Sequence, residues 1–451
     1  MKKSTKLMTL LMAMVLTTGS LAACGGNSDD SAATAAPQAS TAGGEEGSNG
    51  GTPTDVSLKV WVPQEDTQGY GEYGENLTEY MINEFNKSQT KWNVKPEIKP
   101  VAEGDAYKTV NTDPSKAADV IAAAGDNMVQ LIDGGYISPI ADTKVEEVKK
   151  EENNPSVAIE GATFEDKDLG GKFLYGVPFS PNTWFMYYDK SKYSEEEVKS
   201  LETMMAKDLK DTKYNFCMPL DNGWYAPAFF FAAGCNLFGE DGMNPESCDF
   251  NSEAGVSAGK YIMDLAHNKK FFMDDNNSVG INYLKDGSLA AWCGGTWNAE
   301  QVKKALGENY AATVMPTVKI GDKDVSLQPY SSYKYFVVKA NDDAQIAEAA
   351  QDLAIWLGGK ECQEIRLKAR EVAPTWKSVS ESSEATGSPA VAACMAQGLT
   401  GHPQPGIVQM GNTWDSIKAF VTWAKGKDAK EDGIKGELNK MVENILAEIK
   451  K

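Results

Sequence analysis

Three carboxylic acids of this 451-residue chain follow directly on segments that are predicted to be strands. Glu65 and Asp66 come shortly after the apolar run at residues 58–62, and Asp126 follows the run at residues 119–123. Strands that alternate with helices favour a mainly parallel sheet, and ligands of such sheets gather beyond the carboxyl ends of the strands. These carboxylates are therefore candidates for accepting hydrogen bonds from a ligand. Their plainer interpretations stay open, since Glu65 and Asp66 also fit a solvated loop and Asp126 could cap the following helix.

Two tryptophans lie in segments that are typical of exposed loops. Trp297 follows Gly294-Gly295-Thr296, and Trp414 follows the Pro/Gly-rich residues 401–406. Both side chains are expected to face a cleft, whereas Trp61, inside a predicted strand, is expected to pack in a core. Tryptophan offers a flat apolar surface with a polar tip, which suits a ligand of mixed polarity.

The residue types argue against most catalytic and metal chemistry. His267 and His402 are isolated, no Ser-His-Asp arrangement is visible, and the six cysteines after Cys24 lack metal-ligand spacing. No cofactor and no metal are expected. A surface glycoside hydrolase stays open, because it needs only two carboxylates that flank the scissile bond and this acidic chain offers many pairs.

The charge composition limits the classes of ligand. The formal net charge is −20, and Arg366 and Arg370 are the only arginines. Nucleic-acid binding needs a cationic surface, so it is not expected. The scarcity of arginine also argues against a clamped phosphate or carboxylate. The expected ligand is neutral.

The N-terminus is predicted to be a targeting segment. Three lysines within the first six residues precede an apolar run at residues 7–16, which is too short to span a bilayer. Leu21-Ala22-Ala23-Cys24 resembles the lipobox of bacterial lipoproteins. That resemblance implies a signal peptide at 1–23 and a Cys24 that receives a diacylglyceryl group. The polar residues up to 54 are predicted to form a flexible tether on the extracellular face of the cell membrane.

The remainder of the chain is long enough for two domains. Helical spacing of apolar residues is seen around residues 77–85 and again from 438 to 449. The strands predicted from apolar runs lie at 58–62, 92–101, 119–123, 173–177, 184–188, 311–314 and 335–338.

Several segments, in order, resemble extracellular solute-binding proteins of the maltose/maltodextrin-binding type. They are Leu58-Lys59-Val60-Trp61-Val62 with the following acids, Ala118-Asp119-Val120-Ile121 with Gly125-Asp126, Tyr175-Gly176-Val177-Pro178, the run from Ala290 to Trp297, and Gln409-Met410-Gly411-Asn412-Thr413-Trp414. The resemblance implies two hinged α/β lobes of the periplasmic-binding-protein type that enclose a sugar. The implied N-terminal lobe is 55–180 plus 318–376, and the implied C-terminal lobe is 183–316 plus 377–451. Three crossings are expected near 180–183, 315–317 and 374–377.

The resemblance also implies the binding residues. Glu65, Asp66 and Asp126 would accept hydrogen bonds from sugar hydroxyls. Aromatic faces would come from the second lobe, and further candidates lie beside these positions. The aromatic residues are Tyr225, Trp297 and Trp414, and the further candidates are Asn127, Asn182, Trp184, Asp221, Asn222 and Trp224.

Three positions depart from the pattern of the maltose binders. Ala123 stands where a tryptophan is expected, Asn127 replaces a basic residue, and Asn182 replaces a glutamate, for which Trp184 could substitute as an aromatic contact. The departures put specificity for α-1,4-glucans in question. The expected function is that of a monomeric, non-catalytic binding subunit that delivers an oligosaccharide to the permease of an ABC transporter. A hydrolase, a binder of another oligosaccharide, and a sensor or adhesion module remain as alternatives.

Overall fold

The computed structural model describes residues 52–166, 169–274 and 279–448. Cys24, the signal peptide and nearly all of the predicted tether lie outside these residues. Within the described residues, no helix is long and apolar enough to cross a membrane.

The first lobe is built on a sheet with the strand order β16-β15-β3-β1-β2. The parallel strands β1 (Thr54–Val62), β2 (Trp92–Pro100) and β3 (Val120–Ala124) meet the antiparallel β15 (Tyr330–Lys339). Every residue of β3 is buried, because α11 (Ala344–Gly358) contacts one face of the sheet and shorter helices contact β3 as well. The alternating strands and helices thus place the carboxyl ends of β1 and β3 side by side.

Other elements complete the first lobe. Asn76 caps α1 by accepting a hydrogen bond from the backbone of Glu79, and α1 packs against α11. The other elements of the first lobe are α1 (Leu77–Ser88), α2 (Ala106–Thr112), α3 (Gly125–Asp133), β4 (Ile137–Ser138), α4 (Asp142–Lys149), α5 (Ser156–Glu160), β5 (Thr163–Asp166), β6 (Gly171–Leu174), β7 (Val177–Asn182) and α12 (Lys360–Arg370).

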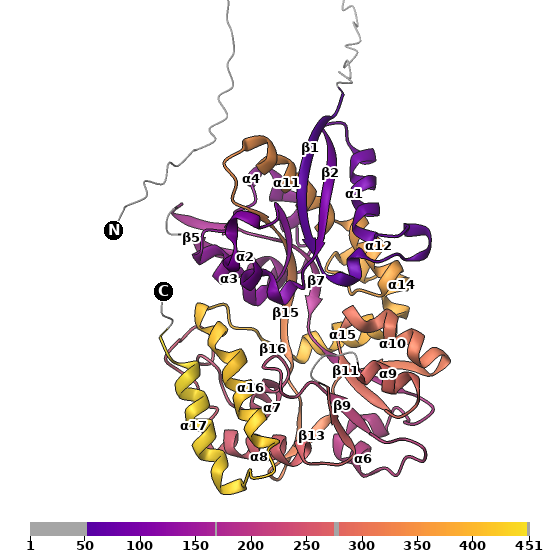
Figure 1. Cartoon of the computed structure of the whole chain (residues 1–451), viewed down its shortest axis with the longest axis vertical. Helices are drawn as coiled ribbons and strands as arrows, with labels where there is room; N and C mark the ends of the chain where they lie inside the picture. The colour runs from indigo at the N-terminus through magenta and orange to yellow at the C-terminus, as the bar shows by residue number, and fades with distance from the viewer. Residues whose placement is uncertain (1–51, 167–168, 275–278, 449–451) are drawn as a thin grey trace, which may run out of the picture. The chain divides into compact units, whose positions relative to one another are not determined.

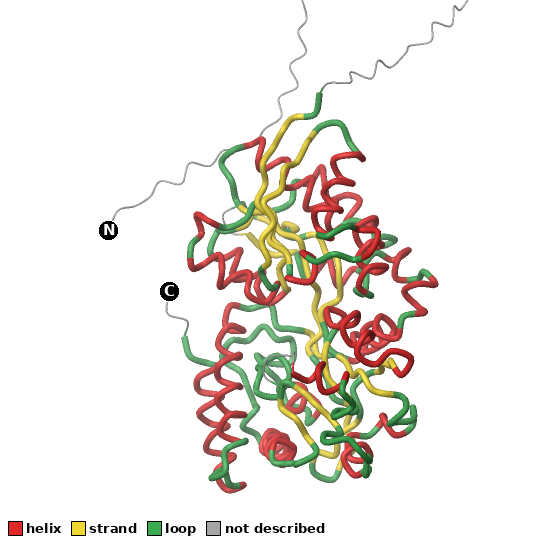
Figure 2. The backbone as a smooth tube through the Cα atoms, turned by 45° about the vertical axis from the view of Figure 1, so that its right-hand side comes forward, coloured by secondary structure: helices red, strands yellow, loops and turns green. Residues whose placement is uncertain are grey.

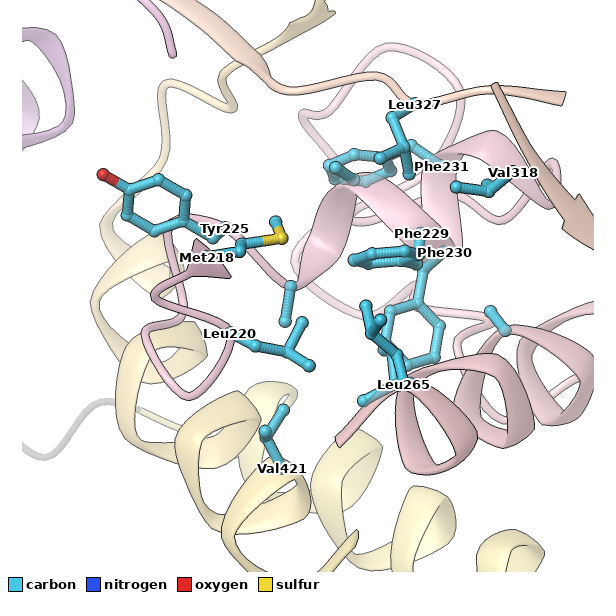
Figure 3. Packing of buried hydrophobic residues seen from close by; sticks show 14 of the residues in the cluster. Met218, Leu220, Tyr225, Phe229, Phe230, Phe231, Leu265, Val318, Leu327 and Val421 are labelled. Atoms are coloured by element: carbon cyan, nitrogen blue, oxygen red, sulfur yellow. The ribbon is translucent and has the colours of Figure 1, made fainter. Parts of the chain in front are cut away.

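The second lobe has its own sheet, with the strand order β10-β9-β11-β8-β12. Its core is rich in phenylalanine from α7, and Figure 3 shows Phe229, Phe230 and Leu265 packed together while the hydroxyl of Tyr225 points away from the other labelled side chains. The strands are β8 (Phe185–Asp189), β9 (Phe216–Met218), β10 (Phe271–Met273), β11 (Ala291–Gly294) and β12 (Tyr310–Thr313). The helices are α6 (Leu201–Ala206), α7 (Pro227–Ala232), α8 (Glu253–Ala266), α9 (Val279–Lys285), α10 (Ala299–Leu306), α13 (Lys377–Ser380), α14 (Ser383–Gly387), α15 (Pro389–Thr400), α16 (Thr413–Ala424) and α17 (Ile434–Ile445).

The long strand β15 belongs to both lobes (Figure 1). Its first residue, Tyr330, lies in the core of the second lobe, whereas Tyr335 and Phe336 lie in the core of the first. The strand is also visible as a continuous yellow segment between the lobes in Figure 2. Because β15 pairs with β7 from Ser332 onward, these two strands together form the centre of the connection.

One stretch lies in a different lobe from the one predicted. The hairpin of β13 (Thr317–Ile320) and β14 (Lys323–Ser326) packs in the core of the second lobe through Val318, Ile320 and Leu327. Residues 318–330 were expected in the first lobe. The chain instead changes lobes inside β15, since the apolar side chains of the hairpin are covered by the second lobe's core.

Candidate functional site

Three aromatic side chains from distant parts of the chain form a cluster in the second lobe. The rings of Trp224 and Tyr330 are stacked with centroids 5.3 Å apart, and Trp414 lies 6.3 Å from Trp224 and 6.2 Å from Tyr330. Both tryptophans are half-buried, so each keeps part of its ring accessible. The close approach depends on Gly223, where a Cβ atom would lie 2.8 Å from the Cα of Trp414.

The carboxyl of Asp126 is presented by the first lobe near this aromatic cluster. It lies in the first turn of α3, immediately after β3, and is half-buried. Burial raises the pKa of Asp126 to about 6. Burial also raises the pKa of the Tyr330 hydroxyl, and the charges of Cys248 and Asp126 add to that effect. The lobes meet beside it, because a Cβ atom on Gly411 would lie 2.6 Å from Nε2 of Gln130. Asp126 and the aromatic cluster therefore belong to one inter-lobe site.

A second polar group is centred on Lys334 of β15. Its ammonium donates to Glu103 at 2.9 Å and lies 4.7 Å from the ring centroid of Trp297 in the second lobe. Lys334, Glu103 and Trp297 line one small cavity together with Asp66 and the two arginines. Burial raises the pKa of the neighbouring Glu65, and the charge of Glu103 adds to that effect. Lys334 thus connects the lobes with an ion pair on one side and an aromatic contact on the other.

The structure gives Asp66 a different role from the one predicted. Its carboxylate accepts hydrogen bonds from Nε of Arg366 at 2.9 Å and from Nη1 of Arg370. Although burial alone would raise the pKa of Asp66, the two arginines outweigh it and the pKa is lowered. All three side chains are nearly inaccessible to solvent. Both oxygens of Asp66 therefore already have cationic partners, and the only two arginines of the chain are used in this ion pair.

Two of the predicted aromatic contacts are packed inside the second lobe. Trp184 is fully buried, and its Nε1 donates to the backbone oxygen of Trp224 at 3.3 Å. The ring of Tyr225 lies 4.9 Å from that of Trp184 and is also buried. As a correction to the prediction, the ring of Trp184 has no free face, because the core of the second lobe covers it. The hydroxyl of Tyr225 points away from the labelled core side chains, so a ligand contact through this hydroxyl stays a prediction.

The remaining polar candidates are held by neighbours in the protein. Asn127 accepts from the backbone of Tyr107 at 2.7 Å and donates to Gly104, which fixes the start of α2. Asp221 accepts from Lys425 at 2.9 Å. The amide of Asn182 donates to the hydroxyl of Ser332 at 3.4 Å, and the side-chain oxygen of Asn222 accepts from the backbone nitrogen of Trp224 at 2.9 Å. These residues support the walls of the site.

The sequence analysis did not single out Tyr330, Lys334 or Glu103. The strand was predicted only from residue 335 onward, because the preceding Tyr-Ser-Ser-Tyr-Lys segment has no continuous apolar pattern. For Tyr330 and Lys334, the signal that could have found them is the length of β15, in which residues 330, 332 and 334 share a face. Glu103 lies in the short helix at residues 103–105 and has no such signal.

Comparisons with known proteins agree with the fold. Residues 80–393 match the model of the family described as bacterial extracellular solute-binding protein. The galactooligosaccharide-binding protein of Bacillus subtilis (strain 168) is 27% identical over 323 residues, which are 68% of this chain and 72% of that protein.

Solved structures of similar proteins match this chain over more of its length. One structure, solved with acarbose, has 31% identity and a TM-score of 0.78, and the match covers 87% of this chain and 99% of the other. A maltodextrin-binding protein from L. casei BL23, solved without ligand, has 28% identity and a TM-score of 0.73, with 88% and 100% covered. The predicted two-lobed α/β fold is confirmed. This chain belongs to the family of bacterial extracellular solute-binding proteins, whose members bind substrates.

Proposed function

We propose that this protein is the lipid-anchored substrate-binding subunit of an ABC importer and that its ligand is an oligosaccharide. The observation that carries the proposal is the pairing of an aromatic surface, Trp224 with Trp414, and the carboxyl of Asp126 across two lobes. A pyranose presents apolar C–H faces to aromatic rings and a rim of hydroxyls to carboxylates. A ligand that contacts both lobes stabilises the closed form, which is the form that a permease would recognise.

The composition of the site supports a neutral ligand. Asp126 and Glu65 are acceptors, and the cations near Glu65 already face other carboxylates, as Lys334 does with Glu103. An anionic ligand would have to compete with these ion pairs. Hydroxyl groups can donate to the acids without such competition.

The relatives point to oligosaccharides of two kinds. The structure with 31% identity contains acarbose and the one with 28% identity is named a maltodextrin-binding protein, which favours a malto-oligosaccharide. The relative from Bacillus subtilis is named for galactooligosaccharides, which supports that class as the second candidate. Ala123, where a tryptophan was expected, is buried in β3 and adds no aromatic surface to the site.

Calorimetric titration of the mature protein with maltotriose, acarbose and galactobiose tests the ligand class. We expect heat of binding, with a Kd near the micromolar range, for at least one of them. Absence of binding to all three would refute the proposal. A parallel assay for released reducing sugar separates capture from hydrolysis, and the proposal requires that the oligosaccharides stay intact.

The membrane anchor is tested separately at Cys24. Growth with radiolabelled palmitate should label the wild-type protein and leave Cys24→Ala unlabelled, and the variant should appear in the medium. Retention of the unlabelled variant at the membrane would contradict the proposed lipid anchor.

A further inference from the structure

Among the described residues, two polar side chains on neighbouring segments beside the aromatic cluster have buried atoms without a hydrogen-bond partner. The hydroxyl of Tyr330 is shielded from solvent and unpaired, and so are both amide atoms of Gln404. A buried polar group without a partner costs about 1–3 kcal/mol, so such groups call for an explanation.

Two buried glutamines of this chain show the hydrogen bonds that a side-chain amide with a structural role makes. The side-chain oxygen of Gln363 accepts from the backbone of Thr375 at 2.7 Å, and its nitrogen donates to Gly358 at 2.7 Å. Gln397 accepts from the backbone of Met315 at 2.7 Å and donates to Thr400 at 3.2 Å. The side chain of Gln404 differs from both, because neither of its amide atoms has a partner.

The backbone puts Tyr330 and Gln404 on one face of the strand pair. β15 and β16 (His402–Pro403) run parallel with Tyr330 opposite His402, and the backbone nitrogen of Gln404 donates to Ser331 at 3.1 Å. Because side chains alternate along strands, Gln404 lies on the same face as His402 and Tyr330. The ring of His402 on this face stacks on Phe231, with centroids 3.7 Å apart.

The ring of Tyr330 cannot turn its hydroxyl toward a protein partner. Trp224 stacks on it, while Trp414 and Phe231 make T-shaped contacts with it, with centroid distances of 6.2 Å and 5.2 Å. Burial raises the pKa of this hydroxyl, with smaller contributions from Cys248 and from Asp126 of the first lobe, and the hydroxyl makes no hydrogen bond to Asp126. The hydroxyl is therefore fixed beside the aromatic surface and the acid that form the proposed ligand site.

We infer that Tyr330 and Gln404 hydrogen-bond directly to the ligand and determine which hydroxyls of the oligosaccharide are accepted. This inference rests on the proposed function. An amide offers a donor and an acceptor side by side, which matches two adjacent hydroxyls of one sugar ring, and the tyrosine offers a third contact. Because β15 connects the lobes, a ligand held here would lie at the hinge and contact both of them.

Apolar replacements of the same shape test the inference. Tyr330→Phe and Gln404→Leu each remove only polar atoms that lack a partner, so the ligand-free proteins should melt at or above the wild-type temperature. Each variant should bind the best ligand among maltotriose, acarbose and galactobiose about tenfold more weakly than the wild type. Loss of affinity without loss of stability is the result that a merely structural role would not give.

Tyr335→Phe is the matched control on the same strand. The hydroxyl of Tyr335 donates to the backbone of Ala158 at 3.1 Å in the core of the first lobe. This variant should melt at a lower temperature and bind with wild-type affinity. If the wild type binds a sugar and both test variants bind it equally well, the inference is overturned and the proposed function stands. If the wild type binds none of the three sugars, both are overturned.

Discussion

Replacing Asp66 with asparagine separates a structural role of this carboxylate from the ligand-binding role predicted for it. The side chains of Asp66, Arg366 and Arg370 are 1%, 1% and 4% exposed. Asparagine keeps the volume but removes the carboxylate that pairs with both buried guanidinium groups. Breaking a buried ion pair by removing one partner costs about 3–5 kcal/mol, and we expect a loss of that size.

The acid dependence of stability gives the same test a second readout. The folded pKa of Asp66 lies below its unfolded value, which is about 3.9. The contribution of the Asp66 carboxylate to the free energy of unfolding is therefore fully present above about pH 3.9. It is lost as the pH falls through the folded pKa. Asp66→Asn should lack this part of the acid destabilisation.

Urea unfolding at several pH values, followed by tryptophan fluorescence, measures the loss of stability and its dependence on pH. Asp55→Asn is the control, because Asp55 pairs with Lys95 on the exposed surface and its removal should leave the midpoint unchanged. Sugar affinity of Asp66→Asn, measured where the variant is folded, should stay within about threefold of the wild type. A loss of stability below about 1 kcal/mol together with lost affinity would refute the structural role.

Three further predictions concern the site. Trp414→Ala and Trp297→Ala should each weaken sugar binding by about 1–3 kcal/mol in calorimetry with little change in melting temperature. Unchanged affinity in both would contradict the aromatic contacts predicted for these two residues. Because the pKa of Asp126 is raised to about 6 and its ionised form is the better acceptor, affinity should rise between pH 5 and 7 in the wild type. The affinity of Asp126→Asn should be lower and independent of pH in that range, so a parallel pH profile would count against this acid. Lys334→Met removes a contact to both lobes and leaves Glu103 without its lysine partner. Small-angle scattering should therefore give a larger radius of gyration for the ligand-free variant than for the wild type. An equal radius would argue that Lys334 does not hold the lobes together.

The sequence predicted the elements whose signals are local. The apolar runs at 58–62 and 119–123 are strands in the structure, and the acids after them lie at the carboxyl ends of β1 and β3. The periodic apolar residues from Leu438 onward lie on α17. Such patterns are readable because a buried strand or helix face must be apolar at a fixed period.

The lobe boundary at β13 and β14 could not be read in this way. Val318 and Ile320 have the same alternating pattern in either lobe, and only the core that covers them decides which one they join. The resemblance to sugar-binding proteins located the site but did not distinguish a contact from a supporting residue. Trp184 and Trp414 are both tryptophans near the site, yet only Trp414 keeps part of its ring accessible.

By itself, the sequence determined the α/β class, the negative net charge and the candidate acids and aromatics, and its resemblance to a known family implied the two lobes. The tertiary structure decided that Asp66 belongs to a buried ion pair with both arginines, that Trp184 and Tyr225 lie in a core, and that Tyr330 and Gln404 are unpaired among the described residues. The physical reason is that local patterns record which residues prefer burial or solvent. Which groups satisfy one another depends on segments up to 304 residues apart, as with Arg370 and Asp66.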